Sequence, residues 1–178
     1  AHFGLCGGCK WQHMDYQAQL RYKQNEVRDH LQRIGKLELP EISPILPAPQ
    51  PYYYRNKMEF SFSNARWLEE SEIELDGEIV NRNALGLHIP GMWDKVLDLK
   101  ECHLQPDPSN AIRLAIKNYA IANGLQFFDP RKQEGFLRSL MIRNTLEGDF
   151  MVILQFYRDA PELRNPLLDY IVQTFPRV

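Results

Sequence analysis

The chain has 178 residues, of which 44% are apolar and 25% charged, ordinary values for a folded globular protein. The formal net charge is −2, so overall charge gives no sign of nucleic-acid binding, and any surface for a polyanion must be a local patch. No apolar run approaches the roughly 18 residues of a membrane span. No secretory signal opens the chain, so we expect a cytoplasmic protein with no membrane partner.

Residues 1–39 are predicted to form a cysteine-containing loop followed by a long amphipathic helix. Asp15 is a suitable N-cap for this helix and Gly35 a suitable end. An apolar stripe at helical spacing lies between them: Tyr16, Leu20, Val27, Leu31 and Ile34. We expect this stripe to find too little cover within the monomer, so that the helix packs loosely or against a second copy of the chain.

Residues 40–178 are predicted to form an α+β domain, a mainly antiparallel sheet with flanking helices. Prolines first punctuate residues 40–51, which indicates an extended connector. The expected strands are 52–63, a hairpin over 72–80 around Asp76-Gly77, 85–89, 95–99, 137–144 and 150–157. The expected helices are 107–124 and 161–175.

The three cysteines are Cys6, Cys9 and Cys102. A disulfide framework is a poor interpretation in a cytoplasmic chain of this size, whereas Cys-x-x-Cys places two thiolates on one tight turn, as metal or cluster ligation requires. Cys102 follows a predicted strand, where a ligand can be presented. Two alternatives stay open: two surface thiols with one buried cysteine, or a Cys₃His zinc site completed by His103.

The run His-Phe-Gly-Leu-Cys-Gly-Gly-Cys-Lys-Trp-Gln-His at residues 2–13 closely resembles the cluster-binding signature of RNA (uracil-5-)-methyltransferases. Further similar segments follow in the order of that family: 54–62, 85–88, 135–138 and 142–143. In the family, Cys-x5-Cys-x2-Cys and a distant fourth cysteine hold a [4Fe–4S] cluster. The resemblance implies that Cys6, Cys9 and Cys102 are iron–sulfur ligands. The first ligand would precede Ala1 directly and is missing.

The resemblance implies that the chain is the central, RNA-binding and [4Fe–4S]-bearing region of an enzyme that makes 5-methyluridine with S-adenosylmethionine, with ribosomal RNA favoured over transfer RNA. The family's β-barrel domain and its catalytic domain, with the S-adenosylmethionine site, are expected outside this chain, because no Gly-x-Gly-x-x-Gly and no cysteine after Cys102 occur. We therefore expect no catalytic residue here, no activity of the chain by itself, and no intact cluster. The alternative is a non-enzymatic RNA-binding or zinc-stabilised module.

Basic and aromatic residues stand together on or beside two predicted strands. They are Arg55, Lys57, Arg131, Lys132, Arg138 and Arg143, near Tyr52, Tyr53, Phe127 and Phe128. Cations neutralise phosphates and aromatic rings stack on unpaired bases, but solvated charges and core aromatics are the commoner interpretation of such residues. With the family resemblance, RNA contact by Arg55, Lys57, Arg138 and Arg143 is favoured. We expect these four on one face, away from the acidic segment 69–78.

Overall fold

The computed structural model describes residues 2–73 and 81–178, which fall into two compact units. The smaller unit comprises residues 9–51. The larger unit joins the N-terminal residues to the part of the chain that begins at Tyr52. No helix in the described part of the chain has both the length and the apolar character that a membrane span needs.

Helix α1 (Tyr16–Asp29) dominates the smaller unit, as expected. The Asp15 carboxylate caps it by accepting hydrogen bonds from the N–H groups of Gln17 and Ala18 at 3.0 and 3.2 Å. A short π-helical segment (His30–Ile34) continues the helix, and Gly35 follows. The Asp15 cap therefore explains why the helix begins at Tyr16.

The proline-rich connector packs along α1. The Gln24 side chain donates to the carbonyl of Ser43 at 3.2 Å and accepts from the N–H of Ile45 at 3.0 Å. Leu20 is buried, whereas Val27, Leu31 and Ile34 are exposed. Self-association through this exposed stripe remains a prediction.

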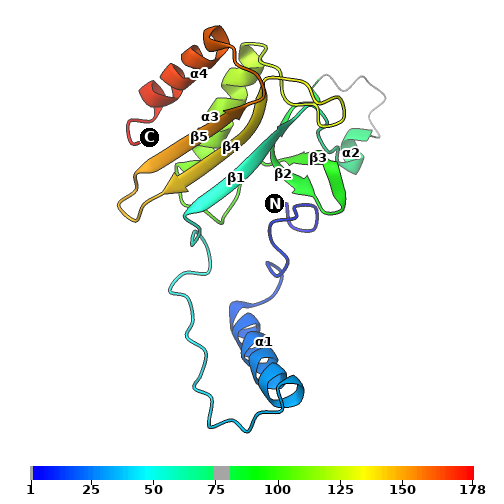
Figure 1. The fold of residues 1–178 in the computed structure, drawn as a ribbon, viewed down its shortest axis with the longest axis vertical. Helices are drawn as coiled ribbons and strands as arrows, with labels where there is room; N and C mark the ends of the chain where they lie inside the picture. The colour runs from blue at the N-terminus through cyan, green and yellow to red at the C-terminus, as the bar shows by residue number, and fades with distance from the viewer. Residues whose placement is uncertain (1, 74–80) are drawn as a thin grey trace. The chain divides into compact units, whose positions relative to one another are not determined.

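The larger unit contains a five-stranded antiparallel sheet with the order β3-β2-β1-β4-β5 (Figure 1). Its strands are β1 (Lys57–Ser63), β2 (Ala84–Ile89), β3 (Met92–Asp98), β4 (Leu137–Asn144) and β5 (Phe150–Phe156). Its long helices are α3 (Ser109–Ala122) and α4 (Pro161–Thr174). This arrangement confirms the predicted α+β class with a mainly antiparallel sheet.

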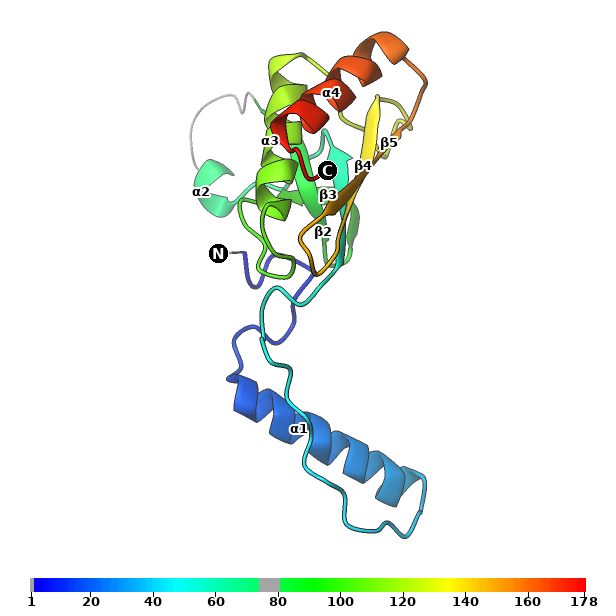
Figure 2. The ribbon, with the colours of Figure 1, turned by 90° about the vertical axis from the view of Figure 1, so that its left-hand side faces the viewer.

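Helices α3 and α4 lie on the same side of the sheet (Figure 2). The alternating residues Met58, Phe60 and Phe62 of β1 are buried on that side, and the guanidinium of Arg113 on α3 lies 5.5 Å from the Phe60 ring centroid. Because side chains alternate along a strand, the residues between them point to the opposite face. That face, called the open face below, carries exposed side chains of β1, β4 and β5.

The hairpin predicted over residues 72–80 is wrong where the structure describes it. Residues 72 and 73 belong to helix α2 (Glu70–Ile73), and residues 74–80 lie outside the described part of the chain. The Glu72 carboxylate accepts the N–H of Glu69 at 3.0 Å and two hydrogen bonds from Arg66 at 2.7 and 3.2 Å. Such a cap stabilises a helical turn, and an alternating pattern cannot reveal it.

Two carboxylates fasten the loop that follows Asp129. The Asp129 carboxylate accepts the N–H groups of Arg131 and Lys132 at 2.9 and 3.0 Å and the Asn64 amide at 3.1 Å. Asp94 accepts from Arg131 at 2.6 Å. Burial of Asp94 acts to raise its pKa, but the bond and charge of Arg131 outweigh this, so the pKa is lowered. The hydrogen bonds from Lys132 and Asn64 lower the pKa of Asp129.

These lowered pKa values predict acid sensitivity. A carboxylate with a folded pKa below its unfolded value of about 3.9 contributes stability that is fully present above that value and lost as the pH falls through the folded pKa. We expect the unfolding midpoint in urea to drop as the pH is lowered below about 4. Asp94→Asn with Asp129→Asn should be less stable at neutral pH and should show a smaller drop. An equal drop in both proteins would contradict this prediction.

Candidate functional site

The N-terminal loop carries Cys6 on a tight turn. The Cys6 N–H donates to the carbonyl of His2 at 2.9 Å, and the Gly8 N–H donates to the Cys6 Sγ at 3.4 Å. A Cβ at Gly7 would lie 3.2 Å from the carbonyl oxygen of His88, and one at Gly8 would lie 3.0 Å from the side chain of Leu87. The two glycines therefore allow the turn to approach β2 closely.

His2 joins this turn to the segment after β3. Its Nε2 accepts the N–H of Lys100 at 3.0 Å, and its side chain is buried. Burial lowers the pKa of His2, which keeps the imidazole neutral and able to accept this bond. The hydrogen bond places the Cys6 turn beside the chain that leads to Cys102.

Two side chains of α3 hold the Cys102 segment. The Asn110 Oδ1 accepts the Cys102 N–H at 2.9 Å, and the Asn110 Nδ2 donates to the Cys102 carbonyl at 3.0 Å. Arg113 is fully buried and donates to the carbonyls of Leu99, Lys100 at 3.1 Å and Leu85 at 3.4 Å. Arg113 also donates to the Asn110 Oδ1 at 3.3 Å. These bonds give Cys102 a defined backbone position.

Cys6 and Cys102 are half-buried thiols, and neither is in a disulfide bond. Burial raises the pKa of the Cys6 thiol; the Gly8 N–H opposes this shift and Cys102 adds to it. Cys9 follows three residues after Cys6 but belongs to the smaller unit. Across residues 2–73 and 81–178, no group of three or more His, Cys, Asp or Glu side chains is gathered for a metal ion.

The His103 side chain is engaged elsewhere. Its Nδ1 lies 3.2 Å from the Tyr53 hydroxyl and 3.6 Å from a carboxylate oxygen of Glu101. His103 is therefore not gathered with the cysteines in the described part of the chain, as a Cys₃His zinc site would require.

The open face brings two of the predicted RNA contacts together. Lys57 of β1 and Arg143 of β4 are direct cross-strand partners, and both side chains are exposed. Like charges directly opposite one another on a sheet repel. Neither cation has a carboxylate within ion-pair distance among the described residues. Exposed Glu59 lies on the same face two residues along β1 but forms no ion pair with either cation, so the pair can accept an external anion.

Arg138 and Arg55 are placed differently. Arg138 occupies a bulge in β4, and its guanidinium lies 4.4 Å from the Phe128 ring centroid, so part of its surface covers the core. Arg55 precedes β1, and its N–H donates to the carbonyl of Leu104 at 2.8 Å. Phe127 and Phe128 are both buried, so neither ring is available for stacking on a base.

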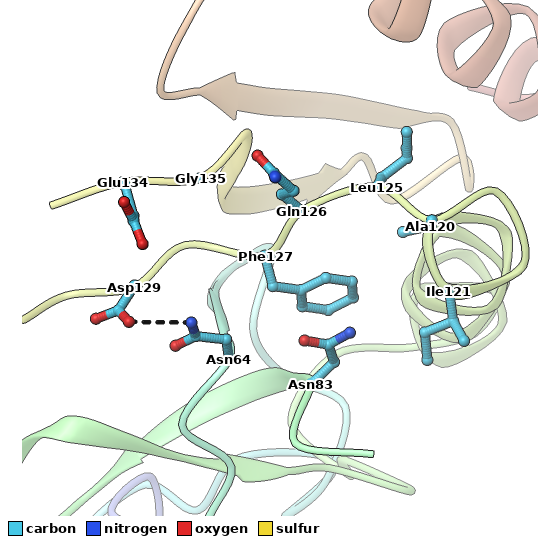
Figure 3. A pocket seen from close by; sticks show the side chains of 11 residues that line it. Asn64, Asn83, Ala120, Ile121, Leu125, Gln126, Phe127, Asp129, Glu134 and Gly135 are labelled. Atoms are coloured by element: carbon cyan, nitrogen blue, oxygen red, sulfur yellow. Dashed lines mark hydrogen bonds between the residues drawn. The ribbon is translucent and has the colours of Figure 1, made fainter. Parts of the chain in front are cut away.

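A cavity of about 450 Å³ opens where β1 and α3 end (Figure 3). The amides of Asn64 and Asn83 and the carboxylates of Asp129 and Glu134 line it beside the Phe127 ring. None of the described residues that line it is a Lys or Arg. With two carboxylates present, the cavity is unsuited to phosphate.

Sequence reasoning missed three residues that shape these sites: His2, Asn110 and Arg113. Asn110 and Arg113 are three residues apart on one face of a predicted helix, and only this spacing in the segment after Cys102 offered a signal. Tyr54 stands in the same short tyrosine run as Tyr52, and its exposure was visible only in the fold.

No protein-family model matches the chain. The chain is 50% identical over 182 residues to an uncharacterized RNA methyltransferase of Porphyromonas gingivalis. This match covers 99% of this chain and 39% of that protein. It is 49% identical over 180 residues to one of Bacteroides thetaiotaomicron, with 99% and 40% covered. The chain is 39% identical over 164 residues to an uncharacterized RNA methyltransferase of Nitratidesulfovibrio vulgaris, and this match covers 92% of this chain and 32% of that protein.

The fold is also similar to part of a solved structure, that of Pyrococcus abyssi tRNA (uracil-54, C5)-methyltransferase in complex with S-adenosyl-L-homocysteine. The TM-score is 0.64 at 23% identity, and the match covers 93% of this chain and 34% of that one. Together, these similarities define the chain as an α+β unit of the RNA methyltransferase type. The family resemblance in the sequence is confirmed: the chain belongs with the RNA methyltransferases. It spans about two fifths of the length of the two relatives named first.

Proposed function

We propose that this chain is the central, RNA-binding and iron–sulfur-bearing region of a longer S-adenosylmethionine-dependent RNA (uracil-5-)-methyltransferase. The observation that carries the proposal is the 50% identity to an RNA methyltransferase over 99% of this chain. The chain spans 39% of that relative, so the proposal puts the methyl-transfer chemistry in the remainder of the protein. By itself the chain would be inactive, and its compartment would be the cytoplasm.

The cysteine site supports the iron–sulfur part of the proposal. Cys6, Cys9 and Cys102 would supply three thiolates, and a cysteine before Ala1 the fourth. The buried guanidinium of Arg113 stands one helical turn from Asn110, which holds Cys102, and a buried positive charge favours an anionic neighbour. A bound [4Fe–4S] cluster would join the N-terminal turn to the Cys102 segment and so hold this part of the RNA-binding region rigid.

The open face supports the RNA part. Lys57 and Arg143 are exposed, adjacent and without a carboxylate partner among the described residues, so phosphate groups can neutralise them. Arg55 and Arg138 complete the proposed contacts. Ribosomal RNA is the substrate we favour, with transfer RNA as the alternative. A non-enzymatic RNA-binding or zinc-stabilised module is the competing function.

Iron content tests the cluster. We expect the 178-residue chain, which has three cysteines, to hold no intact [4Fe–4S] cluster, because such a cluster takes four thiolates. A variant with a cysteine directly before Ala1, prepared without oxygen and supplied with iron and sulfide, should be brown with broad absorption near about 400 nm.

The matched control is the same variant with Cys102→Ser, which should lose the colour. A colourless, iron-free product from the four-cysteine variant would count against the iron–sulfur assignment. Binding of zinc but not iron would favour the zinc-stabilised module. Transfer of a methyl group from S-adenosylmethionine to RNA uridine by the complete gene product tests the enzyme assignment separately.

A further inference from the structure

Three consecutive tyrosines lie in front of β1, and the middle one is fixed. The Tyr53 N–H donates to the carbonyl of His103 at 2.8 Å, and the Tyr53 hydroxyl lies 3.2 Å from His103 Nδ1. The rings of Tyr52 and Tyr53 both contact the His103 ring edge-on, at centroid distances of 6.2 and 6.1 Å. The ring cluster is thus held by His103, the residue after Cys102.

These rings are exposed despite their size. The exposed fractions are 49% for Tyr52, 45% for Tyr53 and 61% for Tyr54. Tyr53 has a positive φ of 57°, a conformation that costs free energy for a bulky residue and is common at functional sites. Its two bonds to His103 compensate for that cost. The backbone therefore holds three large rings on the surface, where the hydrophobic effect by itself would not place them.

Cations that have no acidic partner among residues 2–73 and 81–178 follow directly in the chain. Arg55 comes immediately after Tyr54, and Lys57, opposite Arg143, begins β1. The Asn56 carbonyl accepts the N–H of Asn144 at 3.1 Å, which ties the segment after the tyrosines to the end of β4 beside Arg143. Rings and cations are therefore neighbours in the larger unit. This combination of stacking surfaces and positive charge matches unpaired nucleic acid.

We propose that Tyr52, Tyr54 and the Tyr53–His103 pair form a stacking platform for unpaired bases of the RNA, beside the cations that contact its phosphates. This inference rests on the proposed RNA-binding function and specifies its partner as single-stranded RNA rather than a duplex. Tyr53 and His103 hold the platform in place, and Tyr52 and Tyr54 offer the free ring faces. The phenol rings contact the π-face of any base, so little sequence preference is expected from them.

The test uses two probes on this chain at low salt: a short unpaired RNA oligonucleotide of mixed sequence, and an oligonucleotide of equal length with abasic sites in place of the bases. Fluorescence anisotropy gives the Kd for each. Tyr52→Ala and Tyr54→Ala should each weaken binding of the base-containing RNA about 10-fold and leave the abasic probe and the salt slope unchanged. Tyr52→Phe and Tyr54→Phe should bind as the unchanged protein does, because phenylalanine keeps the ring.

Equal affinity of the alanine variants and the unchanged chain for the base-containing RNA would overturn the platform while leaving the RNA-binding function intact. Equal losses for both probes would also overturn it, because stacking needs bases. Failure of the unchanged chain to bind either probe would instead overturn the RNA-binding function and the platform with it. Both tyrosines are exposed, so circular dichroism should show that the variants fold normally.

Discussion

Lys57→Glu together with Arg143→Glu is expected to weaken binding of single-stranded RNA about 100-fold at low salt. Each cation that neutralises a phosphate releases counterions, so losing two contacts should also reduce the slope of log K against log salt by about 1.4. The pair is adjacent on the open face and has no carboxylate partner in the described structure, so phosphate is the anion it can accept. Titrations at several salt concentrations measure both quantities.

The matched control is Lys132→Glu with Arg164→Glu, which changes the net charge equally. Lys132 lies 3.6 Å from a carboxylate oxygen of Glu134, and Arg164 lies 2.6 Å from one of Asp159. Because these cations already have partners, the control should retain most of the affinity and the full slope. If the Lys57 and Arg143 variant kept the original slope, both residues would be ordinary surface charges.

Lys57→Glu as a single change separates binding from stability. It replaces a repulsive cross-strand pair by an attractive one, so the free energy of unfolding should rise by up to about 0.5 kcal/mol. RNA affinity should nevertheless fall. Opposite changes in the two quantities would indicate that the like-charged pair is kept for binding at a cost in stability.

Arg113→Met is expected to lower the free energy of unfolding by about 3 kcal/mol. Arg113 is fully buried, and its removal leaves the carbonyls of Leu85, Leu99 and Lys100 without these donors. The buried Arg113 Nε has no hydrogen-bond partner in the described structure, so the substitution also removes the cost of desolvating this group. This gain reduces the expected loss of stability. Urea unfolding followed by circular dichroism measures the change.

Asn110→Ala provides the comparison, with an expected loss of about 1 kcal/mol. Asn110 and Arg113 are bonded to each other, so the two losses should not add, and a double-mutant cycle measures the difference. The Cys102 amide should exchange faster with deuterium in both variants. An Arg113→Met protein as stable as the original would show that an apolar side chain replaces the buried guanidinium without penalty.

Local patterns in the sequence were sufficient for most of the elements. The alternation of Met58, Phe60 and Phe62 predicted β1 because only one face of that strand meets a core. Asp15 marked the start of α1 because its side chain reaches the next N–H groups without help from the rest of the chain. The cysteine spacing and the segments around it also indicated the family, which the relatives confirmed.

Sequence patterns gave wrong predictions where contacts between particular side chains decide the local structure. The residues around Glu72 alternate as a strand does, yet the Glu72 carboxylate caps a helical turn with Arg66 as its partner. Phe127 and Phe128 resembled stacking residues in sequence, but the fold buries both, while Tyr54 is exposed. Burial depends on which elements pack together, so composition around an aromatic residue does not determine its role.

The sequence by itself determined the class of fold, the family and the three candidate thiolates, because these depend on periodicity and on spacing along the chain. Only the tertiary structure decided that Lys57 faces Arg143, that His2 brings the Cys6 turn to Lys100, and that His103 holds Tyr53. Each of these pairs joins residues from distant parts of the chain or from different strands. Strand register and long-range hydrogen bonds bring them together, and neither leaves a periodic signal in the sequence.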